Sequence, residues 1–584
     1  MMPRLRNLLI LLVLFTSGCI SGSSKRINNE IMTIAQIQGC AHKSPFTGKS
    51  VEGVRGVVTA KAYNGFYMQS FNPDGLDCSS EGIFVFTDEF AEVIPGDEVR
   101  INGLVQEFLP GAVEDKNLTI TEIINPEVNI ISTGNSLPPE VEIGYRGRRL
   151  PDQIIDNDSL ADFDPDEDGA DFYESLESML VSVEGGVVVG PRNAFNEIVI
   201  IPQEFRKLNQ MSSAGALIQT ENDANPERLI LNLNQENKQS ISIGAVLQDQ
   251  VIGVMDYSYG NYKVKAFGIV QLSETFPMTT GLKTQENTLS LVTYNVENLS
   301  IQDEERKFRA IASDIIDDLK MPDIILLHEV MDDSGIEDDG NVSAAKTINR
   351  LIDAIVREGG PVYSLLTVDP EDNTNGGIPG GNIRSVLLYR SDSGLFPVED
   401  SRYMALNQNP TVIGSNKWPF SATRKPLVAI MDWQGHRFLV VAVHLTSRGL
   451  DSPLFGSVQP IERLEEQKRI AQAALLMQFL TDFHQKHPEM PIILAGDVND
   501  DIWSKTLSEL TSQTLYDAGK TIADNERYSY ILDGNAIQLD HILVSDPASI
   551  VQYTIPHLNS MFDHNLQISD HDPVLIELDF GTSN

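Results

Sequence analysis

Short hydrophobic runs separated by Gly, Pro and Asn fill the first half of the chain. Between residues 31 and 132 they include VRGVVTAKAYNGFYMQS, EGIFVFTDEF and GDEVRINGLVQEF, which are typical of β-strands joined by turns. A second series, with MLVSVEGGVVVG and VLQDQVIGVMDYSYGNYKVKAFG, lies between residues 133 and 286. The pattern predicts two β-rich domains, 31–132 and 133–286, of which the first is a small five-stranded barrel.

The pattern changes near residue 287, because apolar strands now alternate with amphipathic helices. Apolar residues recur at helical spacing between residues 308 and 319, again between 348 and 355, and through 462–484. Strand-like runs such as LSLVTYNVENL, PDIILLHEV and PIILAGDVND lie between these helices. Strands and helices mixed over this length predict one large α/β domain at 287–580.

The N-terminus has the pattern of an export signal. Two arginines precede an apolar run at residues 8–15, which is too short to span a bilayer but fits the core of a signal peptide. The following TSGC resembles the lipobox of bacterial lipoproteins, although Thr16 stands where Leu is more usual. We predict a signal peptide at 1–18, lipidation of Cys19 and a flexible tether at 19–30; ordinary cleavage beside a chance cysteine is the alternative. By the same resemblance, Ile20 favours sorting to the outer membrane or cell surface.

Two further cysteines, Cys40 and Cys78, complete the three of the chain. An exported protein folds in an oxidising compartment, where such a pair can close a loop. We predict a disulfide between them in the first domain. Two independent thiols are the alternative that the sequence leaves open.

The charge balance is strongly acidic, with 43 Lys and Arg against 83 Asp and Glu and a net charge of −40. This excludes a clamp that holds nucleic acid by bulk positive charge. It does not exclude phosphate chemistry, because carboxylates that bind a divalent cation create positive charge locally.

One acidic segment, Asp164-Pro165-Asp166-Glu167-Asp168-Gly169, matches the beginning of an EF-hand loop. The twelfth position is Ser175, where such a loop needs a bidentate Glu. We therefore predict a solvated acidic turn here, with a calcium site as the alternative.

In the second half, strand after strand ends or opens with a polar residue. Asn295 and Glu297 close the first strand and share parity, so they point the same way. The others are Glu329 in PDIILLHEV, His444 in VVAVHLTSRG, Asp497 and Asn499 in PIILAGDVND, Asp540 in IQLDHILVS, and Asp570 and His571 in ISDHDPVLIEL. Burying a carboxylate beside an apolar strand is costly without a partner. A set of this size indicates a site for a divalent metal ion and proton transfer.

The ordered series TYNVENL, LLHEV, AVHLTSRG, AGDVND, QLDHILVS and SDHDP resembles the deoxyribonuclease-I-like endonuclease/exonuclease/phosphatase superfamily. Segments such as GGIPGGNIRSVLLYR and RYSYILDGNAIQLDH resemble its secreted bacterial branch, in which an OB-fold-like domain precedes the catalytic domain. The resemblance implies a four-layer α/β fold, with a two-sheet β-sandwich flanked by helices and the active site at one rim. It also implies that the first barrel is OB-fold-like.

The resemblance further implies a metal site. Glu329 becomes the principal carboxylate ligand of a divalent cation, with Asn295, Glu297 and Asp570 assisting. Mg²⁺ is the expected ion, and Ca²⁺ or Mn²⁺ are alternatives.

The remaining residues take catalytic roles by the same resemblance. His571 acts on the attacking water or the phosphate, and Asp540 orients its ring. Asp497 positions the nucleophilic water, Asn499 holds a phosphate oxygen, and His444 donates to the phosphate or protonates the leaving oxygen. Which histidine is the base stays open. Two arginines are candidate phosphate clamps, with surface ion pairing as the alternative: Arg384 and Arg424.

The sequence thus favours a metal-dependent phosphoesterase, foremost a nuclease that cleaves nucleic acid at the cell surface. A phosphatase or phosphodiesterase acting on nucleotides, inositol phosphates or lipid headgroups is the nearest alternative. A surface binding protein without catalysis is a third, and the complete set of strand-end residues argues against it.

Overall fold

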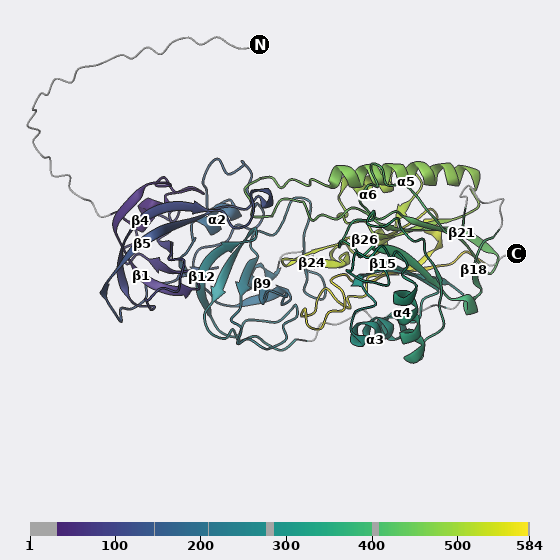
Figure 1. Ribbon diagram of the computed structural model, residues 1–584, viewed down its shortest axis with the longest axis horizontal. Coiled ribbons are helices and arrows are strands. Elements are labelled where there is room, and N and C mark those ends of the chain that lie inside the picture. Colours follow the sequence, from purple (N-terminus) through teal and green to yellow (C-terminus); the bar gives the residue numbers. More distant parts are fainter. Residues whose placement is uncertain are drawn as a thin grey trace, which may run out of the picture.

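The structure is a computed structural model, and it describes residues 32–144, 146–207, 210–275, 285, 287–399 and 408–581. A β-barrel domain, a second β-rich domain and a larger sandwich domain follow one another along its long axis (Figure 1). The predicted signal peptide, tether and lipidation residue Cys19 lie outside the described residues. Within the described part, no helix has the length and apolar character that crossing a membrane requires.

The first domain is the five-stranded barrel that the sequence predicts. Its strands close in the order β1-β2-β3-β5-β4, and the interior is filled by apolar side chains such as Phe66, Val85 and Ile101. The elements are α1 (Ile34–Gln38), β1 (Ser50–Ala62), β2 (Gly65–Gln69), β3 (Gly82–Phe86), β4 (Glu98–Phe108), η1 (Val113–Asp115) and β5 (Ile120–Ser132). Closure of the barrel removes the unpaired strand edges that an open sheet would leave.

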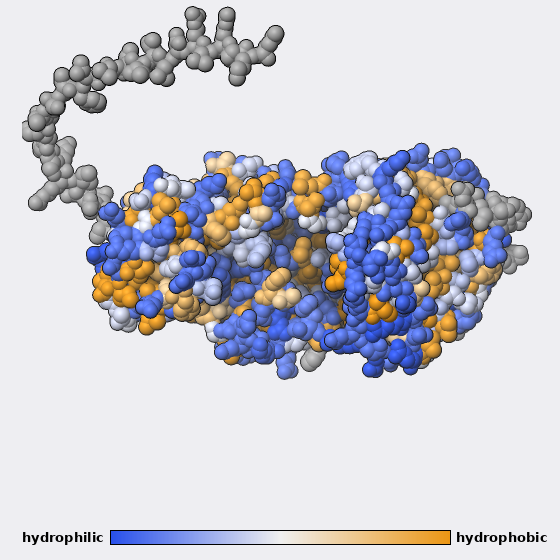
Figure 2. Space-filling model, in the orientation of Figure 1, coloured by the Kyte–Doolittle hydropathy of each residue, from blue (hydrophilic) through white to orange (hydrophobic). Residues whose placement is uncertain are grey.

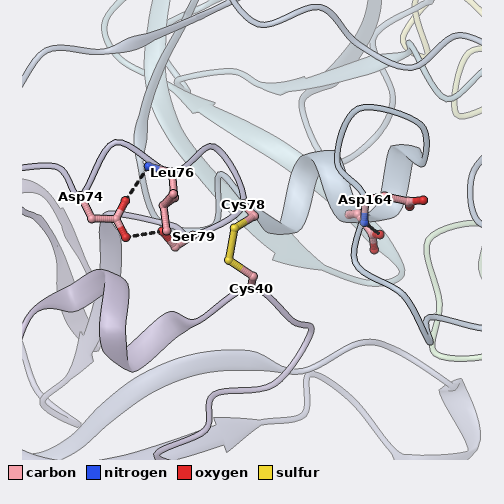
Figure 3. Close-up of a disulfide and its surroundings, with 7 residues drawn as sticks. Cys40, Asp74, Leu76, Cys78, Ser79 and Asp164 are labelled. Carbon is pink, nitrogen blue, oxygen red and sulfur yellow. Dashed lines mark hydrogen bonds between the residues drawn. A yellow bond between two sulfur atoms is a disulfide. The ribbon is translucent and has the colours of Figure 1, made fainter.

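Cys40 and Cys78 form a disulfide in this domain, with their Cα atoms 5.0 Å apart (Figure 3). Cys40 follows α1, and Cys78 lies in the loop between β2 and β3. Asp74 orders the same loop, because its carboxylate accepts from the Leu76 amide at 2.8 Å and from the Ser79 hydroxyl at 2.9 Å. The disulfide therefore joins the N-terminal segment to the barrel.

A seven-stranded sheet forms the second domain, in the order β6-β7-β12-β13-β11-β9-β8. Its strands alternate with turns as predicted, and Phe172 and Tyr173 of α2 pack into its core. The elements are β6 (Val141–Ile143), α2 (Gly169–Glu174), β7 (Leu180–Val183), β8 (Gly186–Gly190), β9 (Glu197–Pro202), η2 (Gln203–Lys207), β10 (Leu217–Ile218), β11 (Leu229–Asn232), β12 (Val251–Ser258) and β13 (Asn261–Ala266).

The acidic segment at residues 164–169 differs from the solvated turn that we expected. Asp168 is 1% exposed, and Asp171, just inside α2, is fully buried beside His42 of the first domain. Ser175, at the twelfth position, donates to the Phe172 carbonyl oxygen, while Asp164, Asp168 and Asp171 place carboxylate oxygens within 4.8 Å of one another. The segment is therefore part of the contact between the two β-rich domains, and it still lacks the bidentate ligand of an EF-hand.

The third domain is a four-layer α/β sandwich. One sheet has the order β16-β17-β15-β14-β28-β27, and the other β18-β20-β21-β22-β26-β23 with β19 beside β20. Apolar residues of both sheets, such as Leu291, Ile324 and Val440, fill the space between them. Helices α3 and α4 cover the outer face of the first sheet, and α5 and α6 that of the second. This is the arrangement that the sequence predicts.

The elements of the first sheet and its helices are β14 (Leu289–Leu299), α3 (Glu305–Ser313), the π-helical turn η3 (Asp314–Asp318), β15 (Ile324–Val330), α4 (Ala345–Arg357), β16 (Ser364–Leu366), β17 (Arg384–Tyr389), η4 (Ser391–Ser393), η8 (Pro547–Ser549), β27 (Ile550–Thr554) and β28 (Val574–Leu578). Those of the second are β18 (Leu395–Pro397), β19 (Thr411–Val412), β20 (Leu427–Trp433), β21 (His436–His444), α5 (Glu466–Lys486), β22 (Ile492–Asp497), α6 (Lys505–Leu510), β23 (Tyr516–Asp517), η6 (Ala518–Thr521), η7 (Asp524–Glu526) and β26 (Asp540–Val544).

A small sheet connects the second and third domains. Strand β10 of the second domain pairs in parallel with β25 (Asn535–Ile537), which forms a hairpin with β24 (Tyr530–Leu532) of the third. The hairpin lies between the two domains in Figure 1. Backbone pairing between the domains fixes their relative position at this point.

Candidate active site

Neighbouring strands of both sheets deliver polar residues to one rim of the sandwich. His444, Asp497 and Asp540 are direct cross-strand partners at the ends of β21, β22 and β26. Asn295 and Glu329 come from the ends of β14 and β15 in the other sheet. Cross-strand partners lie close enough for their side chains to interact. Strand register therefore explains why residues far apart in sequence meet here.

At the rim, hydrogen bonds of Asn295 join the two sheets. Its side-chain amide donates to Glu329 Oε1 at 3.2 Å and to Asp497 Oδ2 at 3.2 Å. Nε2 of His444 lies 3.8 Å from the same Glu329 oxygen and 3.5 Å from the same Asp497 oxygen. Glu329, His444 and Asp497 thus form a compact group whose candidate ligand atoms lie within 4.8 Å of one another.

A second group, formed by Asp497, Asp540 and His571, shares one member with the first. Nδ1 of His571 lies 2.7 Å from Oδ2 of Asp540, and both side chains are buried. Ser529 fixes this carboxylate, because its hydroxyl donates to Asp540 Oδ2 at 2.8 Å and accepts from the Asp540 amide. The Asp540–His571 pair is therefore held in place by the β26 backbone and by the segment before β24.

The two histidines have opposite electrostatic environments. Burial lowers the pKa of His571, but Asp540, Asp570 and Asp497 outweigh it and hold the pKa well above its usual value. Burial and the nearby Arg424 hold the pKa of His444 well below its usual value. A neighbouring carboxylate favours the charged ring, and desolvation favours the neutral one. These shifts favour the protonated ring of His571 and the neutral ring of His444.

Several site residues have a left-handed backbone that costs free energy for residues other than Gly. Glu329 has φ 62°, Asn499 has φ 56°, and Glu297 and Asn298 have φ 48° and 53°. The ladder between β14 and β15 is irregular between Asn295 and Leu299, where this conformation begins. Such residues cluster at functional sites because the surrounding fold compensates the strain. Here the bend places the Asn298 amide 3.1 Å from Glu329 Oε2.

Hydrogen bonds and a buried ion pair fix Asn499 and the loop after β22. The Asn499 backbone amide donates to Asp497 Oδ1 at 2.8 Å, and its side chain donates to the Leu445 carbonyl oxygen at 3.3 Å. Arg469 of α5 holds the same loop through an ion pair of 3.0 Å with Asp500, and both side chains are fully buried. These contacts set the position of Asp497.

Glu297 and Asp570 lie on the side of the site that faces the second domain. Burial and then Asp570 raise the pKa of Glu297 to about 7. Tyr530 lies beside them, with its ring centroid 4.9 Å from that of His571 and a backbone bridge to the same residue. These residues extend the site towards a cleft between the domains.

The two candidate arginines have different surroundings. Arg424 is buried beside the first group, where Glu329 and Asp497 oppose the lowering of its pKa by burial. It donates to the Leu445 carbonyl oxygen at 2.7 Å, and its Nε has no hydrogen-bond partner among the described residues. Arg384 donates to the Asn382 carbonyl oxygen at 2.9 Å and pairs with Asp369 at 2.7 Å. These contacts correspond to the ion-pairing alternative for Arg384, because loop groups already occupy its guanidinium.

The residues present suit a hard divalent cation. Glu329 and Asp497 place carboxylate oxygens around one point, and such oxygens are the preferred ligands of Mg²⁺, Ca²⁺ and Mn²⁺. Within the described residues, Nδ1 of His444 and Oδ1 of Asp540 are buried without a hydrogen-bond partner. Buried polar atoms without partners at a site are typical of groups that act on a ligand. Glu329 and Asp497 are therefore the residues that would hold the ion.

Some residues of the site were not assigned from the sequence. Ser529 and Tyr530 lie in RYSYILDGNAIQLDH, a segment that resembles the family, yet nothing in its spacing shows which side chains contact Asp540 and His571. Ser569, whose hydroxyl donates to the Asn295 carbonyl oxygen at 2.7 Å, stands directly before Asp570. Its place beside a predicted site residue is the one signal that could have identified Ser569.

Comparison with known proteins gives a family match for each of the second and third domains. Residues 292–571 match the Endonuclease/Exonuclease/phosphatase family, and residues 142–274 match a family described as Domain of unknown function (DUF8508). The third domain of this chain therefore belongs to the endonuclease/exonuclease/phosphatase superfamily, as the sequence motifs predict. Members of this superfamily are metal-dependent phosphoesterases in general.

Solved structures with a similar fold each cover 50% of this chain. A mannosyl-6-phosphatase of Bacteroides thetaiotaomicron is 18% identical, is covered over 100% of its length and has a TM-score of 0.35. Humanized D. rerio TDP2 is 14% identical, is covered over 99% and has a TM-score of 0.34. A truncated Caenorhabditis elegans TDP2 is 17% identical, is covered over 97% and has a TM-score of 0.35. No curated protein sequence matches the chain.

Proposed function

We propose that this protein is a metal-dependent nuclease that hydrolyses phosphodiester bonds, with Mg²⁺ as its cation. The observation that carries the proposal is the convergence of Glu329, Asp497 and the Asp540–His571 pair at one rim, at the distances given above. Carboxylates that bind a cation and a histidine that holds a proton are the components of in-line displacement at phosphorus.

In this proposal the reaction is divided between the residues that bind the cation and the Asp540–His571 pair. A divalent cation bound by Glu329 and Asp497 would neutralise charge on the phosphate oxygens. His571, held beside Asp540, would donate a hydrogen bond to a phosphate oxygen. Arg424 adds a fixed positive charge beside Glu329 and Asp497. His444 is neutral and can exchange a proton with water or with a leaving oxygen.

We also propose that the protein is exported and anchored by a lipid on Cys19, with the barrel acting as an OB-fold-like module at the cell surface. The apolar run and the TSGC sequence support export. The Cys40–Cys78 disulfide supports an oxidising compartment. Wild-type protein is expected to fractionate with membranes, and Cys19→Ala to become soluble. A wild type that is soluble and begins elsewhere would refute the anchor without affecting the catalytic proposal.

The catalytic proposal is tested by assaying purified protein with Mg²⁺ on plasmid DNA, single-stranded DNA, RNA and a panel of phosphomonoesters. Cleavage of a nucleic acid, lost on addition of EDTA and in Glu329→Gln, is the expected result. The Lys116–Glu462 ion pair of 2.6 Å supplies the control, because Glu462→Gln also removes one carboxylate charge and Glu462 does not contribute to the site. Hydrolysis of phosphomonoesters alone would make the protein a phosphatase. Hydrolysis of neither class would refute the proposal.

A further inference from the structure

A cleft of about 790 Å³ lies between the second domain and the candidate active site. Figure 2 shows the molecular surface hollowed between these two parts. One wall consists of turns of the second domain, and the other of the β24–β25 hairpin and the segment before β28. Asp570 and Tyr530 belong to the cleft wall, and Tyr530 also contacts His571. Two residues of the cleft wall, Tyr530 and Asp570, therefore border His571, which is itself 6% exposed.

Three large apolar side chains are exposed in this cleft. Phe195, in the turn between β8 and β9, is 78% exposed, and Tyr259, in the turn between β12 and β13, is 81% exposed. Leu532 of β24 is 51% exposed on the opposite wall. Leaving two aromatic rings in water beside a catalytic site has a cost in free energy, and apolar surface gathered in this way marks a binding site.

The backbone of Tyr259 gives independent support. Its φ is 50°, a left-handed conformation that is unusual for a bulky aromatic residue. A two-residue hairpin turn favours Asn or Gly at such a position, because Asn and Gly adopt positive φ at lower cost. The adjacent Gly260, with φ 73°, follows this rule and Tyr259 does not. The turn itself therefore does not favour Tyr259, whose ring centroid lies 5.7 Å from Nζ of Lys263.

The two walls are held rigidly together. Nδ2 of Asn261, beside the Tyr259 turn, donates to Asp533 Oδ2 at 3.0 Å, and Arg228 donates to the Asp533 carbonyl oxygen. Gly534 packs so closely that an added Cβ would lie 2.7 Å from Val199. The cleft is therefore preformed, which lowers the entropic cost of binding a ligand.

The charge of the cleft argues against a run of phosphates within it. Lys263 is paired with Glu197 at 2.7 Å, and Arg192 is paired with Asp563 at 2.9 Å. Of the remaining charged lining groups, Asp533 and Asp570 are negative. A groove that follows a nucleic-acid backbone needs unpaired positive charge. Here the ligand portion that fits is neutral, aromatic and able to hydrogen-bond.

We propose that the cleft binds the nucleobase and sugar of the nucleotide whose phosphate lies at the metal site, with the base stacked on Tyr259 and Phe195. Amide side chains of Asn232 and Gln567 line the same cleft and can hydrogen-bond a base edge, whereas the Asn193 amide is bonded to Glu197 within its own turn. The inference rests on the proposed function and makes the second domain part of substrate recognition. Because neighbouring phosphates are disfavoured in the cleft, the substrate is a short single strand or a strand end.

Two p-nitrophenyl substrates distinguish binding of the base in the cleft from hydrolysis of the phosphoester. The p-nitrophenyl ester of thymidine 5′-phosphate carries a base, and methyl p-nitrophenyl phosphate does not. We expect Tyr259→Ala and Phe195→Ala each to raise KM for the first about 10-fold, as for loss of one base-stacking contact, and to leave kcat/KM for the second within about twofold. Tyr259→Phe retains the ring and should behave as wild type. Tyr63→Ala, which removes an 87% exposed tyrosine from the first domain, is the matched control.

Calorimetry with thymidine 5′-monophosphate and with glucose 6-phosphate measures binding without turnover. Weaker binding of the nucleotide in Tyr259→Ala and Phe195→Ala, but not in Tyr63→Ala, supports the inference. Unchanged nucleotide binding, or equal losses on both p-nitrophenyl substrates, would overturn it. Binding of glucose 6-phosphate that depends on the same rings, without such binding of the nucleotide, would assign the cleft to sugar phosphates and would also overturn it. A wild type that binds the nucleotide through Tyr259 yet cleaves no phosphoester would refute only the proposed function.

Discussion

Replacing the two members of the Asp540–His571 pair tests the catalytic assignment most directly. Nδ1 of His571 lies 2.7 Å from Asp540 Oδ2, and the relative exposures of the two residues are 6% and 0%. Water therefore does not screen the pair, and the carboxylate favours the protonated ring. His571→Ala removes the proton donor itself. Asp540→Asn keeps a side chain of similar shape that Ser529 can still contact, but it removes the charge.

The expected losses follow from these contacts. Positioned acid–base groups contribute about 10²–10⁴-fold in rate, so we expect His571→Ala to lower kcat/KM by about 10³-fold, or about 4 kcal/mol of barrier. Asp540→Asn should cost less, about 10–100-fold, because the ring remains and only its orientation and proton affinity change. The double variant should be little worse than His571→Ala, because residues that act as a unit are not additive.

The assay is kcat/KM on a phosphodiester with Mg²⁺ at constant pH, alongside the melting temperature of each variant. The chain offers a matched control in a second buried pair, His557 and Asp572, whose Nδ1–Oδ2 distance is 3.0 Å. His557→Gln should lower stability but leave the rate per folded molecule close to wild type. Multiplicative losses for the double variant would show that Asp540 and His571 act independently. Near wild-type activity of His571→Ala would refute the assignment.

Three further predictions concern the metal, the disulfide and the domain contact. Glu329→Gln should raise the Mg²⁺ concentration needed for half-maximal activity by 10-fold or more, as measured by titration, because it removes a charged ligand; unchanged Mg²⁺ dependence would mean a different ligand. Replacing Cys40 and Cys78 by Ala should lower the unfolding free energy of the first domain by about 4 kcal/mol in denaturant titrations, because the disulfide closes a loop with a sequence separation of 38; an unchanged midpoint would contradict this. Asp171 and Glu174 raise the pKa of His42 to about 10 from 6.5 although burial lowers it, so its stabilising contribution is present below pH 6.5 and lost as the pH rises towards 10. The melting temperature should fall over this range more in wild type than in His42→Gln, and equal slopes would refute it.

The sequence predicted the third domain well because its signals are local. Each motif lies where a buried strand meets the rim, so an apolar run followed by a polar residue marks both the strand and the site. Asp497 and Asp540 were assigned separately, and register places them opposite each other in β22 and β26. The helix predicted at residues 308–319 appears as α3 and the π-helical turn η3, since the same apolar spacing faces the sheet in both.

Residues whose role depends on tertiary contacts could not be predicted. Arg384 and Arg424 both precede apolar strands, and nothing local distinguishes the one that pairs with Asp369 from the one beside Glu329. The acidic turn at residues 164–169 looks solvated until His42, more than a hundred residues earlier, is placed against Asp171. In each case the partner that decides the role comes from a distant segment, and only packing brings the two together.

The second domain also contributes residues to the proposed binding cleft that could not be identified from its sequence. Phe195 and Tyr259 stand in turns between ordinary strands, where an aromatic residue has no signature of its own. Their role depends on contacts between the domains. Strand β10 pairs with β25, and Asn261 beside the Tyr259 turn donates to Asp533, so both turns line the same cleft as Tyr530 and Asp570. A domain that stabilised the fold alone would gain by burying the two rings or by placing Asn or Gly at the left-handed position of Tyr259. Exposed aromatic residues at that cost, in a cleft where Lys263 and Arg192 are both paired, point to recognition of a neutral ring by this domain while the third domain acts on the phosphate.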